Sequence, residues 1–146
     1  VLGGIARQIR FAGLVPRSCV GEAWAAALHA LPPNLAVPYD VVLAWDVLNP
    51  LDPAEREALV AHLAEITAPR ARLHVVVDCT GVATTQPVAF TLLEPGRIAE
   101  QTTGPPQSVS HPLLPAQVER ALAPFDVVRA FVLRTGVREY LAMKRA

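Results

Sequence analysis

The stretch Tyr39–Trp45, with the sequence YDVVLAW, constrains the fold of this chain more than any other feature. Its apolar run is broken only by Asp40, and such runs are typical of parallel strands that are buried on both faces. A second run of this kind, Arg72–Cys79 (RLHVVVDC), follows after a gap with room for one helix. Because parallel neighbours need a crossover connection, the two runs predict a strand–helix–strand unit.

The predicted crossover helix has a clear start. Asp52 suits the N-cap, Pro53 suits the first helical position, and Glu55 stands three residues after the cap, where a capping box needs it. Pro69 is expected to end the helix. One helical face carries the side chains that would pack on the sheet, namely Ala58, Leu59, His62, Leu63 and Ile66.

Further strands and helices are predicted on both sides of this unit. Those before it are a strand end at Val1–Gly4, a helix over Ile5–Phe11, a strand over Ser18–Glu22 and a helix over Ala23–Leu31. Those after it are a helix over Pro115–Leu122 and two strands, Phe125–Arg134 and Val137–Lys144, joined by Thr135-Gly136. The alternation predicts an α/β fold: a Rossmann-like, open, mostly parallel sheet with helices on both faces and a C-terminal antiparallel hairpin.

Residues 80–112 have a different character. They are rich in Thr, Gln, Pro and Gly, and their one strand-like stretch is Pro87–Leu93. A loop this long in a compact domain is usually functional or disordered. We therefore expect residues 1–146 to form a single domain in which 80–112 is a long lid or insertion, more mobile than the sheet.

Composition excludes several classes of function. The 13 Lys and Arg residues balance the 13 Asp and Glu residues, so no basic face marks a nucleic-acid partner. No apolar run is long enough to cross a membrane, and no signal peptide is visible. Cys19 and Cys79 lie far apart in apolar runs and are interpreted as buried reduced thiols, which predicts a cytoplasmic protein. No pair of histidines has the spacing of metal ligands.

With the hairpin last, the order of elements resembles the class I S-adenosylmethionine-dependent methyltransferase family. Tyr39–Leu51 resembles the family's fourth-strand motif, in which an aromatic-Asp-hydrophobic run leads to an acid and a Leu-rich turn. Val1–Gly4 resembles the first strand and its glycine loop, and Glu22 stands where the family keeps an acid at the tip of the second strand. Leu133–Leu141 resembles the last hairpin of a small bacterial branch with many uncharacterised members.

The sequence also departs from the family pattern at its N-terminal end. The usual Asp-x-Gly-x-Gly loop is reduced to Gly3 and Gly4, and its leading acid is either absent or lies before Val1. Residues 23–38 are too few to hold the family's third strand between Glu22 and Tyr39. The chain does not begin with Met, and we expect residues to be missing before Val1 or between Gly4 and Ile5. The fold is therefore expected to lack part of its N-terminal half.

The resemblance implies S-adenosylmethionine as cofactor and a small-molecule or peptide acceptor. The cofactor-binding residues that it implies are Gly3, Gly4, Glu22, Trp45 and Asp46. Because ligands of open parallel sheets bind beyond the carboxyl ends of the strands, Glu22 and Asp46 are predicted to share one cavity, bordered by the two glycines. Glu22 would accept the ribose hydroxyls.

The candidate catalytic residues are Asp46, Asp78 and His111. Asp46 would face the methionine ammonium or the acceptor, Asp78 would line the acceptor site, and His111 would act as a base. Segment 80–112 would cover the acceptor side or form an interface.

Each of these residues also has a plain structural interpretation. The glycines suit an ordinary turn, and Glu22, Asp46 and His111 suit solvated or capping positions. Trp45 suits a core position. Asn49 suits the turn before Pro50.

Two functional hypotheses follow from the sequence. The first is an active methyltransferase, favoured by Glu22 and Asp46. The second is a non-catalytic domain of the same fold used for binding or assembly, favoured by the short glycine loop and the missing third strand; an oligomer is compatible with either. A nucleotide-binding domain of another Rossmann class is a weaker third hypothesis, since those folds end on parallel strands rather than on a hairpin.

Overall fold

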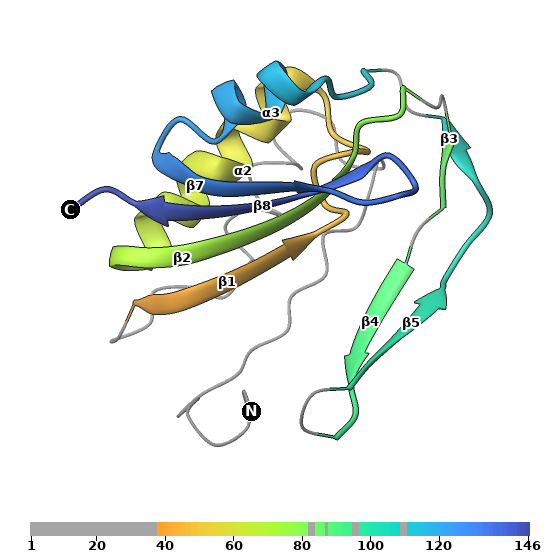
Figure 1. Cartoon of the computed structure of the whole chain (residues 1–146), viewed down its shortest axis with the longest axis horizontal. Coiled ribbons are helices and arrows are strands. Elements are labelled where there is room, and N and C mark those ends of the chain that lie inside the picture. The colour runs from red at the N-terminus through yellow and green to blue at the C-terminus, as the bar shows by residue number, and fades with distance from the viewer. Residues whose placement is uncertain (1–37, 82–83, 87, 95–96, 109–110) are drawn as a thin grey trace.

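The computed structural model describes residues 38–146, apart from 82–83, 87, 95–96 and 109–110. The strands and helices predicted before Tyr39 therefore lie outside the described residues, as do Gly3, Gly4 and Glu22. The described part is built on a four-stranded sheet with the order β1-β2-β8-β7. Two helices and two short β-ribbons accompany the sheet (Figure 1).

The predicted strand–helix–strand unit is present. Strand β1 (Tyr39–Trp45) pairs in parallel with β2 (Thr67–Asp78), from Tyr39 opposite Thr67 to Trp45 opposite Val76. Helix α2 (Pro53–Ile66) makes the crossover. Its capping box is formed, because the Asp52 carboxylate accepts from the Glu55 amide at 2.8 Å and the Glu55 carboxylate accepts from the Asp52 amide at 2.8 Å.

Helix α2 ends three residues before Pro69, and β2 begins earlier than the sequence predicts. Thr67 is buried at the junction, and its hydroxyl donates to the Leu63 carbonyl oxygen at 2.8 Å. The Lys144 ammonium donates to the Thr67 carbonyl oxygen at 2.7 Å and also to that of Ala64. These bonds satisfy carbonyl groups at the helix end and let the chain enter the sheet directly.

The predicted C-terminal hairpin is confirmed. Strand β7 (Phe125–Val132) pairs antiparallel with β8 (Val137–Lys144), and β8 also pairs antiparallel with β2. Gly136 takes the left-handed conformation at the turn, with a φ of 83°. The expectation of a mostly parallel sheet needs correction for the described strands, because β1–β2 is the one parallel pair among three. Insertion of β8 between β2 and β7 is the physical reason.

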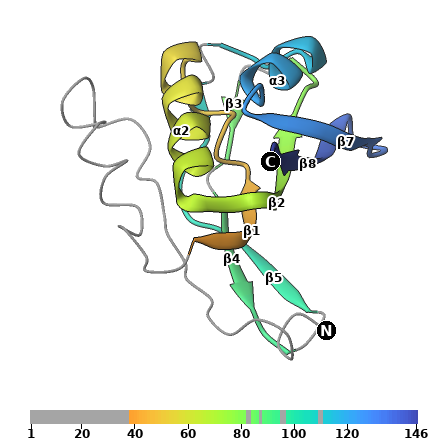
Figure 2. The same cartoon turned by 90° about the vertical axis from the view of Figure 1, so that its left-hand side faces the viewer.

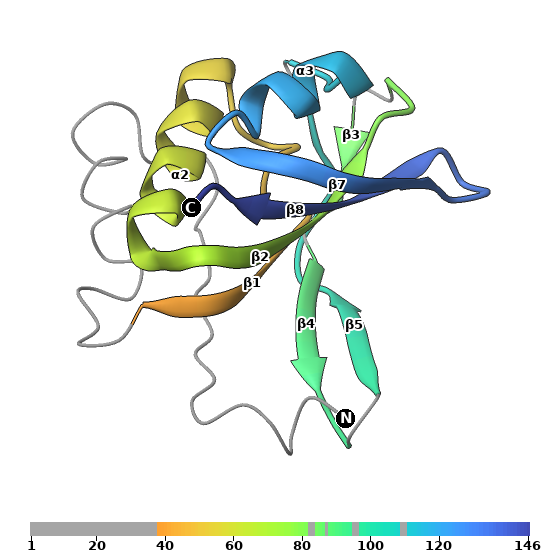
Figure 3. The same ribbon diagram turned by 60° about the vertical axis from the view of Figure 1, so that its left-hand side comes forward.

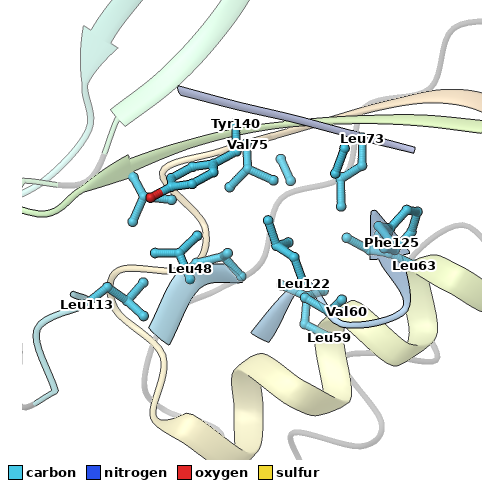
Figure 4. Close-up of a cluster of buried hydrophobic side chains, with 14 of the residues drawn as sticks. Leu48, Leu59, Val60, Leu63, Leu73, Val75, Leu113, Leu122, Phe125 and Tyr140 are labelled. Atoms are coloured by element: carbon cyan, nitrogen blue, oxygen red, sulfur yellow. The ribbon is translucent and has the colours of Figure 1, made fainter. Parts of the chain in front are cut away.

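Helices α2 and α3 (Pro115–Ala121) cover the same face of the sheet (Figures 1 and 2). Figure 4 shows the core between the helices and the sheet, where Leu59 and Val60 of α2 face Val75 of β2 and Tyr140 of β8. The described residues therefore show helices on one face only, and the helices expected for the other face lie outside them. Within the described ranges, no helix is long and apolar enough to cross a membrane.

The described residues of segment 80–112 form four short strands, where the sequence predicts one strand-like stretch. Strand β3 (Thr84–Thr85) pairs with β6 (Gln107–Ser108), and β4 (Val88–Leu92) pairs with β5 (Ile98–Thr102), each pair antiparallel. The β4–β5 ribbon lies on the side of the sheet away from the helices, near the carboxyl ends of β1 and β2 (Figures 1 and 3). This position suits a cover for that edge, and the greater mobility of the segment stays a prediction.

Candidate functional site

The carboxyl ends of β1 and β2 lie at one edge of the sheet because the two strands run parallel. Asp46 comes directly after β1, and Asp78 is the last residue of β2. The Asp46 amide donates to the Val76 carbonyl oxygen at 3.1 Å, which holds the turn against the neighbouring strand. Asp46 has a φ of 54°, a left-handed conformation that Asp and Asn adopt more readily than most residues.

Asp46 sits in a negatively charged environment. Burial raises the pKa of its carboxyl group to about 6, and the negative charges of Asp78 and Glu100 add to the rise. Carboxylates from β2 and from the β4–β5 ribbon therefore both act on Asp46 at this edge. The sequence offers no signal for Glu100, since an acid within a polar segment is ordinarily a solvated one.

Asp78 is held in place by both its side chain and its backbone. Its carboxylate accepts from the Thr80 amide at 2.8 Å and from the Thr80 hydroxyl at 2.6 Å. Its backbone carbonyl and amide bond to the side chain of Asn49, which is only 4% exposed. Asn49 therefore ties the loop after β1 to the end of β2, a role beyond the turn that the sequence suggests.

Trp45 lies outside the hydrophobic core, contrary to the core interpretation. It is half-buried, and its indole ring meets Phe90 of β4 edge-on, with ring centroids 5.0 Å apart. Its Nε1–H donates to Nδ1 of His74 on β2 at 2.7 Å. Trp45 thus joins the sheet to the β4–β5 ribbon on the face opposite the helices.

His111 makes its described contact through its backbone. Its side chain is exposed, while its carbonyl oxygen accepts a hydrogen bond from the guanidinium of Arg56. Arg56 is 4% exposed and also donates from Nε to the Leu48 carbonyl oxygen at 2.9 Å. Within the described residues, none of these contacts brings the His111 side chain to Asp46 or Asp78, so its role as a base stays a prediction.

Two other kinds of chemistry find no support in the described part of the chain. No group of three His, Cys, Asp or Glu side chains there could hold a metal ion. Burial raises the pKa of the Cys79 thiol, which disfavours the reactive thiolate. The expected positions of Gly3, Gly4 and Glu22 at this edge stay predictions.

No protein-family model matches the chain, and no curated protein matches its sequence. Solved structures do match its fold. The glycopeptide N-methyltransferase MtfA in complex with sinefungin superposes with a TM-score of 0.52 at 18% identity, over 76% of this chain and 60% of that one. An S-adenosylmethionine-dependent methyltransferase from Methanosarcina mazei gives a TM-score of 0.50 at 15% identity, over 77% and 63%.

The pyocyanin biosynthetic protein PhzM also matches, with a TM-score of 0.50 at 15% identity, over 74% of this chain and 31% of that one. The chain thus spans less than two thirds of the length of each of these structures. Identities this low establish the fold and nothing finer. With β8 inserted antiparallel beside the parallel β1–β2 unit, the described residues have part of the fold of the class I S-adenosylmethionine-dependent methyltransferases.

Proposed function

We propose that the chain forms part of an S-adenosylmethionine-dependent methyltransferase that acts on a small molecule or a peptide. The observation that supports this most is the position of Asp46. It follows the tip of β1 in a left-handed conformation, next to Asp78 of the parallel neighbour. Open α/β sheets bind their ligands at this edge.

The charge at this edge suits the cofactor. S-adenosylmethionine carries a sulfonium and an ammonium group, and it supplies the methyl group in an already activated form. Burial and neighbouring negative charge work against the ionised form of Asp46, so a bound cation would relieve that repulsion. The Asp46 carboxylate is therefore the group that we assign to the ammonium or to a cationic acceptor.

The pKa of Asp46 suits a second role in the same reaction. A carboxyl group with a pKa of about 6 is a stronger base than an ordinary aspartate and is still largely ionised at neutral pH. It can take the proton that an acceptor N–H or O–H loses as the methyl group is transferred. Asp78, whose position is fixed by Thr80 and Asn49, lies nearby. Most of the rate would come from alignment of the reactants.

The alternative is a non-catalytic domain used for binding or assembly. The favouring observation in the sequence is that residues 23–38 are too few to hold the family's third strand between Glu22 and Tyr39. The two functions differ in turnover. A methyltransferase releases S-adenosylhomocysteine when it meets its acceptor, whereas a binding domain does not.

The experiment that tests the proposed site is NMR mapping of S-adenosylhomocysteine on the labelled chain. We expect amide shifts at residues 45–49 and 78–81 and none at the amino ends of β1 and β2. Asp46→Ala should weaken binding by about tenfold or more, the loss expected for a charged hydrogen-bonding partner. Asp40→Ala is the matched control, since Asp40 is an exposed acid at the other end of the same strand. Shifts confined to the amino ends, or equal losses in both variants, would place the ligand elsewhere.

A further inference from the structure

Four side chains form a continuous path from the β4–β5 ribbon across the sheet. Phe90 of the ribbon meets the Trp45 ring edge-on, with centroids 5.0 Å apart and planes at 76°. The Trp45 Nε1–H donates to Nδ1 of His74 at 2.7 Å. On the other side of the imidazole, Nε2 lies 3.7 Å from a carboxylate oxygen of Glu139 on β8. The path thus runs from β4 through β1 and β2 to β8.

The hydrogen bond from Trp45 fixes the protonation state of the imidazole. An indole N–H can only donate, so Nδ1 of His74 must offer a lone pair and the ring proton must sit on Nε2. A doubly protonated imidazolium has no lone pair and donates from both nitrogens. Protonation of His74 therefore breaks the bond to Trp45, while the pair with Glu139 becomes an ion pair.

The ribbon depends on contacts of this kind for its position. The side chain of Ile98 is 45% exposed, and all the described side chains of β5 except that of Ala99 are exposed. A two-stranded ribbon is marginally stable by itself in water. The Phe90–Trp45 contact is one anchor that holds it to the sheet, and His74 holds the Trp45 ring that Phe90 meets.

We propose that His74 is a pH-sensitive latch that holds the β4–β5 ribbon over the carboxyl edge of the sheet when neutral and releases it when protonated. The latch does not depend on the proposed methyltransferase function, because each contact in it belongs to the chain itself. Imidazole is the side chain that ordinarily changes its charge between about pH 5 and 8. At acid pH the edge that carries Asp46 and Asp78 becomes more open.

The surrounding charges are mixed. Those on this face of the sheet or directed toward it are Arg72 and Asp78 on β2, Glu139 on β8, Arg129 on β7, Asp46 after β1 and Glu100 on β5. Asp46 is the one that could obscure the latch, since its pKa of about 6 places it in the same range. Its protonation acts in the opposite direction, because removing a negative charge beside Glu100 favours a closed ribbon.

The test follows the indole N–H of Trp45 and the amide protection factors of Val88–Leu92 and Ile98–Thr102 by NMR between pH 8 and pH 5. A Trp24→Phe background leaves Trp45 as the single tryptophan. With His74 intact, we expect the indole signal to move and the ribbon protection factors to fall about threefold to tenfold as the pH is lowered. That range is what the loss of one neutral hydrogen bond gives.

Two variants and two controls make the result decisive. His74→Gln offers an acceptor oxygen that does not titrate, so its ribbon should stay protected throughout, whereas His74→Leu should show a loosened ribbon at both pH values. His62→Gln, on α2 away from the ribbon, should keep the wild-type transition, and Asp46→Asn, which removes the opposing titration, should show a transition at least as large. A flat wild-type profile, or a His74→Gln profile that falls like the wild type, would overturn the latch.

Discussion

The side chain of Asn49 closes a ring of two hydrogen bonds with the backbone of Asp78. Its Nδ2 donates to the Asp78 carbonyl oxygen at 2.8 Å, and its Oδ1 accepts from the Asp78 amide at 3.0 Å. The two residues are 29 positions apart in the chain. This ring sets the distance between the loop after β1 and the end of β2, and hence the placement of both candidate acids.

Asn49→Ala should destabilise the chain by about 2 kcal/mol. The substitution removes both bonds and leaves the Asp78 backbone groups partly buried without their partner. Urea unfolding at pH 7 measures the loss. Asn49→Asp is the informative companion, because it keeps the acceptor and loses the donor; stability equal to that of wild type would show that the Nδ2 bond contributes nothing.

Arg56→Met should lower the free energy of unfolding by about 3 kcal/mol. The guanidinium is buried and donates to the carbonyl oxygens of Leu48, Asn49 and His111, so its removal leaves buried acceptors unpaired. Arg56→Lys should recover only part of the loss, since an ammonium cannot span the same fork of acceptors. The exposed Arg97 gives the control, and Arg97→Met should change the unfolding free energy by less than about 0.5 kcal/mol. Equal effects at the two arginines would contradict this account.

Gly136→Ala and Gly81→Ala form a matched pair. Both glycines have a positive φ, 83° and 76°, so each alanine bears the strain of a left-handed conformation, about 1–2 kcal/mol. A Cβ at Gly136 would also lie 2.5 Å from Cγ2 of Thr80, whereas a Cβ at Gly81 meets nothing within 4 Å. Gly136→Ala should therefore lower the free energy of unfolding by about 1–3 kcal/mol more than Gly81→Ala does, as measured by thermal or urea unfolding.

Thr80→Ser in the Gly136→Ala background tests the cause of that difference. It removes Cγ2 and keeps the hydroxyl that donates to Asp78. The double variant should recover most of the stability that Gly136→Ala loses beyond the loss in Gly81→Ala. If it does not, the clash with Thr80 is not what separates the two glycines.

Asp46→Asn should stabilise the chain at pH 8 and leave it unchanged at pH 4. The folded-state pKa is raised from 3.8 to about 6, so within that window the folded chain holds a proton that the unfolded chain has lost. Stability therefore falls as the pH rises from about 4 to 6 and stays lower above it. Asparagine removes this loss and tolerates the left-handed φ of 54°.

The measurement is the melting temperature of wild type and Asp46→Asn at both pH values. Asp40→Asn serves as the control, because that carboxylate is exposed at the far end of β1. An equal gain at pH 4 and pH 8 would mean that ionisation of Asp46 is not the cause. A gain in stability together with a loss of cofactor affinity would mark Asp46 as a residue retained for function rather than for folding.

Local signals in the sequence were sufficient for the framework of the fold. Tyr39–Trp45 is a strand with the predicted bounds, because its apolar run leaves few alternatives. Helix α2 starts where Asp52, Pro53 and Glu55 predict it, since a capping box is a contact between neighbours in sequence.

Contacts between distant residues were not predictable in this way. Arg56 reads as a solvated helix residue, but the loop before its helix and a second loop 55 positions away supply the carbonyl oxygens that make it a buried donor. Strand β5 pairs through its backbone, and its residues IAEQT carry little apolar signal. The role that we propose for His74 depends on a hydrogen bond from Trp45, which lies on another strand.

Calorimetric titration of the chain with S-adenosylmethionine tests the central claim most directly. We expect one binding site per chain, with affinity about tenfold or more weaker in Glu22→Ala and a smaller loss in Glu22→Gln, whose amide oxygen still accepts one ribose hydroxyl. Binding that is indifferent to Glu22→Ala would contradict the ribose assignment. No detectable binding would contradict the methyltransferase account and favour a domain of this fold used for assembly.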